Sequence, residues 1–408
     1  MASSSTTETP IRRLAAVILA AAMAIGGLPG GNRAAAAEVT PLPIGYLEIT
    51  GDARYERKGT YAGIQVRPRV RPVAGAEMAV RESGILRRVI KVGFSLERGG
   101  GKTAAELVAV IERLAAEKGV RYFLIDAAAA PLSAVAEATR GRKLLLFNVS
   151  EAADGLRGAQ CQAHLMHTIP SHGMLTDALA QYLIAKRWRD VLVLKGPLAE
   201  DAALTRAFQN SARRFGVRIA GIRDFILGND PREREKNNVV LITAGVDYDA
   251  VFLADTDGEF GRYVPMQTYL PRPVIGTEGL MADAWHWSWE RHGAPQLNQR
   301  FDRLAKRRMQ AVDWAAWTAV KAIIEAVVRT GSTDFAEVSA YLHGDKLTLD
   351  GYKGTPVNFR PWDNQLRQPI LLHTHNAVVR RAPLTGFLHP VQNMDTLGYD
   401  RGDQMCRF

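Results

Sequence analysis

Short apolar runs alternate with amphipathic stretches along most of the chain. The apolar runs at 44–49, 89–96, 121–126 and 143–149 predict buried strands. Between them, apolar residues recur every three or four positions at 76–89, 103–119 and 131–141, which predicts helices that each lay one face on a sheet. A second series follows, with helices at 173–188 and 201–216 and strands at 190–196, 217–225, 250–255 and 273–277. Two such series predict two α/β lobes with parallel sheets.

The pattern changes after residue 295. A single long helix is expected from 296 to 330. Residues 347–379 then carry β-prone runs separated by the turn sequences KGTP and WDNQ, which indicates antiparallel pairing instead of another crossover unit.

The N-terminus carries an export pattern. Arg12 and Arg13 precede a short apolar run, and the small residues that follow predict cleavage after Ala37. An uncleaved anchor is the alternative, but no later stretch reaches the ~18–20 apolar residues that span a bilayer. Cleavage lowers the formal charge from +10 to +8, because three arginines and one glutamate are lost. Lysines and arginines are scattered, so no nucleic-acid partner is expected.

Only two cysteines occur, Cys161 and Cys406. Because disulfides persist in exported proteins, we expect these two to form a disulfide; two unpaired thiols are the alternative.

Enzyme and cofactor motifs are incomplete. The GGGKT sequence at 99–103 has Leu96 where a phosphate-binding loop needs its first glycine. The DTDGEFG sequence at 255–261 has Phe260 where a calcium loop needs glycine, although Asp255, Asp257 and Glu259 at a strand end remain candidates for meeting a cation; a solvated turn is the alternative.

The spacing of five histidines fits surface or capping roles better than zinc binding: His164, His167, His172, His373 and His375. With no nucleophile elbow or closed metal site in the sequence, we expect a protein that is not an enzyme and that needs no cofactor.

Several motifs in one order carry a family resemblance. The sequences AEMAVRE, VIGTEGL and LDGYKGTPVNFRPWDNQLRQPILL resemble the type I periplasmic binding proteins of the branched-chain amino acid class. More narrowly, DTDGEFGRYVP, PRPVIGTEGLMADAWH, FRPWDNQLRQPI and DTLGYDR resemble a subgroup associated with PQQ-dependent (quinoprotein) alcohol catabolism.

The resemblance implies a bilobal α/β fold in which the chain crosses three times between two Rossmann-like lobes. It places the N-terminal lobe at 38–160 plus 280–345 and the C-terminal lobe at 161–279 plus 346–408. The expected function is that of a monomeric periplasmic component of an ABC transporter, which closes around a small ligand and presents it to a membrane permease.

The resemblance also implies site residues. Glu278 matches the glutamate that holds a ligand ammonium group in the family. Residues expected to face the cleft follow the first strand, the crossing into the second lobe and the strand 250–255: Glu48, Asp52, Tyr55, Ser171, His172, Asp255 and Asp257.

One departure from the family matters for the ligand. The turn that usually grips a carboxylate reads IDAAAAPLSAVAEA here, with Asp126 at its mouth and Ser133 farther on. Six acids near the cleft favour a cationic or polyhydroxylated ligand over an ordinary amino acid, and several of them being caps or ion-pair partners is the alternative. A periplasmic calcium or lanthanide carrier or sensor is therefore a second hypothesis.

Three tryptophans follow Glu278 closely, at 285, 287 and 289. If their segment is helical, Trp285 and Trp289 share a face and Trp287 points elsewhere. Trp285 is then the tryptophan expected to line the same wall as Glu278.

Overall fold

The computed structural model describes residues 39–56, 69–226, 231–403 and 405–406. The predicted export signal, residues 1–37, lies outside the described residues. No helix in the described ranges combines the length and the apolar character needed to cross a membrane.

The first sheet contains five parallel strands in the order β2-β1-β3-β4-β5. Its strands are β1 (Thr40–Ile49), β2 (Val92–Gly101), β3 (Tyr122–Asp126), β4 (Leu145–Asn148) and β5 (Leu165–His167). Every residue of β3 is buried, as expected for a strand covered on both faces. The covering helices that precede β5 are α1 (Val73–Glu82), α2 (Leu86–Ile90), α3 (Ala104–Glu117) and α4 (Ala129–Ala138).

The second sheet contains four parallel strands in the order β7-β6-β8-β9. These are β6 (Asp190–Lys195), β7 (Arg218–Asp224), β8 (Ala250–Ala254) and β9 (Val274–Gly276). The helices of this region are α5 (His172–Ala185), α6 (Ala199–Phe215), α7 (Arg234–Asn237) and α8 (Val239–Thr243). The predicted alternation of helix and parallel strand is confirmed in both sheets.

The predicted continuous helix 296–330 is wrong. Two helices occupy this region, α9 (Ala294–Ala305) and α10 (Ala311–Thr330), and the backbone between them turns left-handed at Lys306, with φ 56°. The buried carboxylate of Asp313 accepts a hydrogen bond from the amide of Gln310 (2.9 Å) and two from the guanidinium of Arg307 (2.6 and 2.8 Å). These bonds cap a new helix start that apolar periodicity does not reveal.

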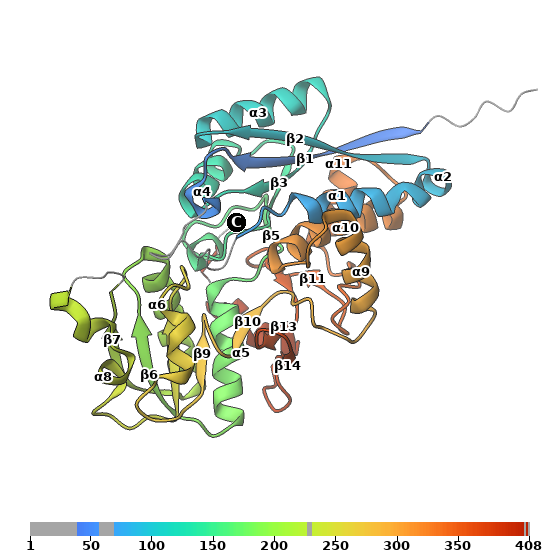
Figure 1. Ribbon diagram of the computed structural model, residues 1–408. Helices are drawn as coiled ribbons and strands as arrows, with labels where there is room; N and C mark the ends of the chain where they lie inside the picture. Colours follow the sequence, from blue (N-terminus) through green and yellow to red (C-terminus); the bar gives the residue numbers. More distant parts are fainter. Residues whose placement is uncertain (1–38, 57–68, 227–230, 404, 407–408) are drawn as a thin grey trace, which may run out of the picture. The chain divides into compact units, whose positions relative to one another are not determined.

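The antiparallel character predicted for residues 347–379 is confirmed. The short pair β11 (Asn358–Phe359) and β12 (Leu366–Arg367) is antiparallel, and so is the pair β13 (Ile370–His373) and β14 (Val378–Ala382). The strand β10 (Met281–Asp283) adds to β13, and α11 (Phe335–His343) precedes this region. Figure 1 shows α3 on one side of the first sheet and α1, α9 and α10 on the other.

Each sheet has its own hydrophobic core. One core cluster contains Ile169, Ala284 and Leu366, and another contains Met174, Ala282 and Ile370. The chain therefore passes between the cores at three segments, 168–173, 282–284 and 366–370, which we call the three crossings. The lobe boundaries expected from the sequence, 160/161, 279/280 and 345/346, stay a prediction.

The predicted disulfide is confirmed. Cys161 and Cys406 are bonded, with a Cα–Cα distance of 5.7 Å and a sequence separation of 245. The bond joins the loop before β5 to the C-terminal segment.

Candidate functional site

A cavity of about 490 Å³ is lined by residues of the first core, such as Ile169 and Trp285, and by Leu175, which packs against the second. Its walls come from the loops after β1 and β4, the first and second crossings, and the N-termini of α6 and α10. Loops beyond the carboxyl ends of parallel strands are where open α/β sheets bind ligands. Of the residues expected from the sequence, this cavity brings together Tyr55, His172 and Trp285.

An ionic cluster lies behind one wall of this cavity. The buried carboxylate of Asp126 accepts hydrogen bonds from the hydroxyl of Tyr55 (2.6 Å) and from the guanidinium groups of Arg71 (3.0 Å) and Arg54 (3.3 Å). Arg54 also donates to Asp52 at 2.8 and 2.9 Å. Asp52 and Asp126 are therefore neutralised by arginines instead of presenting free negative charge to a ligand.

Glu48 joins the same cluster, because its carboxylate lies 3.5 Å from Arg71. Burial and the neighbouring Asp126 raise the pKa of Tyr55, so its phenol stays protonated and can donate. Burial opposes ionisation of Asp52, but the hydrogen bonds from Arg54 outweigh it and lower the pKa of this carboxyl.

The N-terminus of α5 faces the cavity. The hydroxyl of Ser171 caps this helix by accepting a bond from the amide of Met174 (3.2 Å), and His172 is its first residue. The Nδ1 atom of His172 and the Oγ atom of Ser150 are both buried and have no hydrogen-bond partner among the described residues. Both residues line the cavity. Unsatisfied buried polar atoms are costly, so they indicate a place for a polar ligand group.

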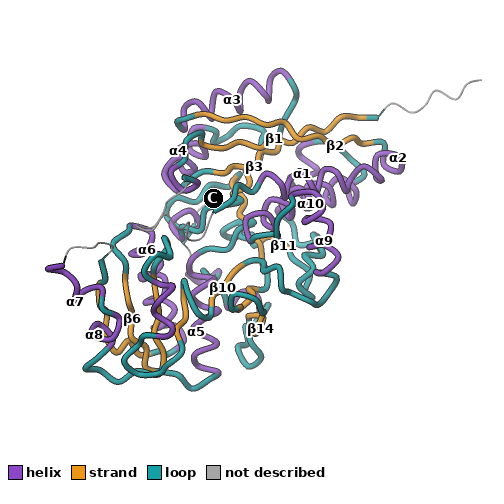
Figure 2. The backbone as a smooth tube through the Cα atoms, in the orientation of Figure 1, coloured by secondary structure: helices purple, strands orange, loops and turns teal. Residues whose placement is uncertain are grey.

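Tryptophans form another wall. Trp285 is buried, donates to Asn298 (3.0 Å) and lies parallel to Trp314 with 6.3 Å between ring centroids. Trp287 also lines the cavity and has the guanidinium of Arg308 over its ring at 3.4 Å. Their segment is irregular and not helical, as Figure 2 shows between β10 and α9. Trp285 and Trp287 therefore both line the wall, whereas a helix would have placed only Trp285 there.

Histidines complete this wall. The rings of His286 and His373 stack at 4.0 Å, and Nε2 of His373 is 2.9 Å from the carboxylate of Asp283. Burial and the neighbouring His373 lower the pKa of His286 to about 4, so this ring is neutral at pH 7. His286, Asp283 and His375 all line the cavity.

Glu278 occupies a tight turn after β9. Gly276 and Gly279 on either side have φ of 112° and 72°, which glycine adopts without strain. The Glu278 carboxylate is half-buried, with Oε1 3.4 Å from the amide of Gly279. It is not among the residues that line the 490 Å³ cavity. Its role as a ligand contact stays a prediction.

Asp255 holds a turn after β8. Its buried carboxylate accepts from the amides of Gly258 (3.1 Å) and Gly261 (2.6 Å), while Asp257 and Glu259 are half-buried in that turn. In the described ranges, no group of three or more histidine, cysteine, aspartate or glutamate residues is placed to hold a metal ion. The turn is accounted for by its own amide bonds.

Ser133 lies apart from the cavity just described. It is on α4 and lines a separate hollow of about 700 Å³ beside Cys161 and Met405. Of the histidines, His164 contacts the hydroxyl of Thr139 at 3.0 Å, and His167 is fully buried next to Asn148. The two histidines therefore have partners within the fold.

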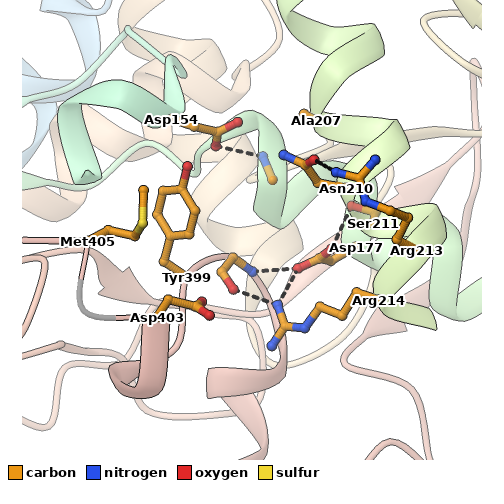
Figure 3. Close-up of a pocket in the computed structure, with 12 residues that line it drawn as sticks. Asp154, Asp177, Ala207, Asn210, Ser211, Arg213, Arg214, Tyr399, Asp403 and Met405 are labelled. Atoms are coloured by element: carbon orange, nitrogen blue, oxygen red, sulfur yellow. Dashed lines mark hydrogen bonds and ion pairs between the residues drawn. The ribbon is translucent and has the colours of Figure 1, made fainter. Parts of the chain in front are cut away.

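A further cavity, of about 540 Å³, lies between α5, α6 and the C-terminal segment (Figure 3). Its wall is polar, but the charged groups already have partners: the buried carboxylate of Asp177 accepts from Ser211 (2.6 Å), Arg214 (2.9 Å) and the amide of Gly398 (2.7 Å). We therefore favour the 490 Å³ cavity as the ligand site, because two of its buried polar groups are unsatisfied.

Sequence reasoning missed several lining residues, which are Arg54, Ser150, Glu200, Trp287, His286 and Gln310. Ser150 directly follows the predicted strand 143–149, and this position at the carboxyl end of a strand could have identified it as a site residue. Glu200 and Gln310 lie at helix N-termini that only the fold brings to the cavity.

Comparisons with known proteins agree on the fold. The model of a family described as periplasmic binding proteins matches residues 71–233. A search of curated proteins found no match.

Many solved structures have a similar fold, and three of them are described here. A periplasmic binding protein from Burkholderia mallei has a TM-score of 0.60 and 16% identity, over 90% of this chain and 98% of that one. A branched-chain amino acid binding protein from Streptococcus pneumoniae, solved with isoleucine, has a TM-score of 0.61 and 15% identity, over 84% and 99%. A solute-binding protein from Rhodopseudomonas palustris, solved with 3,4-dihydroxybenzoic acid, has a TM-score of 0.60 and 11% identity, over 84% and 94%.

At these identities the likeness establishes the fold. Two parallel sheets with flanking helices, three crossings and near-complete coverage of the relatives lead to one conclusion. The chain has the fold of the type I periplasmic binding proteins.

Proposed function

We propose that this protein is the periplasmic solute-binding component of an ABC transporter and binds a small organic ligand in the 490 Å³ cavity. The observation that carries the proposal is the combination of unsatisfied buried atoms, Nδ1 of His172 and Oγ of Ser150, with a tryptophan wall in a cavity lined from both cores. A ligand that touches both cores favours the closed arrangement of the two. A permease partner is part of this proposal, by analogy with solute-binding proteins of ABC transporters that share this fold.

The lining favours a ligand with an apolar or aromatic part and a neutral or anionic polar end. Trp285 and Trp287 offer ring faces, and His172 and Ser150 offer groups that can donate. The cationic ligand expected from the sequence loses support, since Glu48, Asp52 and Asp126 are held by arginines. Isoleucine and 3,4-dihydroxybenzoic acid, bound by two similar proteins, both carry a carboxylate.

We further propose a link to PQQ-dependent alcohol oxidation. It is supported by the sequence motifs DTDGEFGRYVP and FRPWDNQLRQPI, which resemble that subgroup. The ligand would then be a substrate, a product or the quinone itself. The calcium or lanthanide carrier remains an alternative from the sequence, and in the described part of the chain no specific observation favours it.

The proposal is tested by thermal unfolding of the purified protein with isoleucine, 3,4-dihydroxybenzoic acid, alcohols, aldehydes, PQQ, calcium and a lanthanide. An organic ligand at 100 times its Kd should stabilise the folded state by roughly 2.7 kcal/mol. His172→Ala should weaken its binding by roughly tenfold, since a hydrogen bond to the ligand is lost. His164→Ala, outside the cavity, is the control.

Two results would overturn this function. One is a stabilisation by metal alone that Asp255→Ala abolishes. The other is the absence of any shift with every organic compound, while the protein unfolds cooperatively.

A further inference from the structure

A buried lysine lies at the centre of the crossings. Lys353 is fully buried, and within the described residues it forms no ion pair. Its Nζ atom donates to three oxygens: the carbonyls of Ala284 (2.8 Å) and Pro369 (2.8 Å) and Oε1 of Gln368 (2.9 Å). All three N–H groups of an ammonium are thereby used.

These oxygens belong to different crossings. Ala284 ends the second crossing, and Gln368 and Pro369 lie in the third. Gln368 is also fully buried, and its Nε2 donates to the carbonyl of Thr168 (2.8 Å), the first residue of the first crossing. Two side chains, Lys353 and Gln368, therefore connect all three segments by which the chain passes between the cores.

The same lysine contacts the tryptophan wall. Its Nζ lies 3.7 Å from the ring centroid of Trp314, a cation–π contact. Trp314 in turn lies parallel to Trp285, with 6° between the ring planes, and Trp285 lines the proposed ligand cavity. A continuous set of contacts thus runs from the three crossings to the cavity wall.

Burial of this charge is costly for the fold. Burial lowers the pKa of Lys353 well below its usual range, with a smaller contribution from Arg381. An apolar side chain of similar length would avoid the desolvation penalty, so packing alone does not explain a lysine here. Its hydrogen bonds to separate segments supply the explanation.

We propose that Lys353 is a positioning residue that, together with Gln368, makes the three crossings move as one unit and fixes the Trp285 wall of the ligand cavity. Rotation of the cores then proceeds without sliding of one crossing past another. The benefit to ligand capture rests on the proposed function, whereas the coupling itself does not.

The test is amide hydrogen exchange of the purified protein without ligand. Lys353→Met keeps the apolar stem and removes the donors. We expect exchange to become about tenfold faster in all three segments 165–172, 281–289 and 365–371, because Lys353 holds the second and third directly and the first through Gln368. Phe208→Leu, in the core of the second sheet, is the control for general destabilisation and should speed exchange near β6 and β8 only.

A second variant decides the question if Lys353→Met does not fold. Gln368→Met leaves both carbonyl acceptors of Lys353 in place but breaks the link to Thr168. Coupling predicts faster exchange in 165–172 and also in 281–289. A double variant should exchange no faster than Lys353→Met alone, because both side chains act through one network.

Faster exchange confined to 365–371 in Gln368→Met, or spread evenly over both sheets in Lys353→Met, would overturn the proposal. Amide exchange is measured without ligand, so its result does not depend on whether the ligand screen finds a ligand. A negative exchange result likewise leaves ligand binding to be judged by thermal unfolding.

Discussion

Asp177 shows how one buried carboxylate makes the fold sensitive to pH. It lies on α5 and joins this helix to Ser211 and Arg214 of α6 and to the backbone of Gly398 (Figure 3). Burial outweighs the opposing effect of Arg214 and raises the pKa of Asp177 from 3.8 to about 6. The folded state therefore binds this proton more tightly than the unfolded state does.

The sign of the effect follows directly. The stability that Asp177 contributes is fully present below pH 4 and is lost as the pH rises through 6, at roughly 1.4 kcal/mol for each unit of pKa difference. In Asp177→Asn, which has no charge to bury, this loss should be absent. Urea unfolding of both proteins from pH 4 to 7.5 measures it, and the variant should gain relative to the native protein as the pH rises. Parallel curves would contradict the assignment, and Asp403→Asn at the same cavity is the control.

For the site, the sequence predicted some of the lining residues but not the partners of the acidic ones. Tyr55, His172 and Trp285 were expected at the ligand site and line the cavity. The arginines that neutralise Asp126 were not foreseen, because Arg54 and Arg71 are 72 and 55 residues away in the sequence. Long-range charge pairing of this kind has no local sequence signal.

Among the elements, the turn between β9 and β10 depends on glycine for two reasons. Gly279 has φ 72°, and a Cβ there would come within 2.1 Å of the carbonyl oxygen of Val274. Gly245 also has positive φ, 75°, but a Cβ there would meet nothing within 4 Å. The two positions separate backbone strain from steric overlap.

We expect Gly245→Ala to cost about 1–2 kcal/mol of unfolding free energy, the penalty of a left-handed alanine. Gly279→Ala should cost more than twice as much, because the backbone must also move away from Val274. Chemical denaturation of the two variants provides the comparison. Equal losses would show that the turn relaxes without resistance.

Element types were predictable where the apolar pattern was long and regular, as in α3 and the strands β1, β3 and β6. The break between α9 and α10 was not, because it depends on the capping bonds of Asp313 and on Arg307. The tryptophan segment after β10 was also read as a possible helix, although its rings are held by partners such as Asn298 and the carbonyl of Tyr352. Tertiary contacts overrode local periodicity in both places.

At the scale of the whole molecule, the two-sheet α/β class followed from the alternation of elements, and the order of strands within each sheet followed only from the structure. The sequence analysis expected six acidic residues near the cleft, and that expectation rested only on their positions relative to the predicted strands. The contacts of Asp126 and Asp255 show that proximity to a strand end does not make a carboxylate available to a ligand.

The disulfide has a consequence for proteolysis. Cys161 precedes the whole second sheet and Cys406 follows it, so the bond closes a covalent loop around that sheet. A protease that cuts once in an exposed segment of this loop, for example next to Met266, leaves two fragments that remain joined. The nicked protein should run as a single band on a denaturing gel without reductant and as two bands with it. If the two fragments separate without reductant, the disulfide has not formed. If it has formed, a single cut in the loop goes unnoticed in any assay done under oxidising conditions.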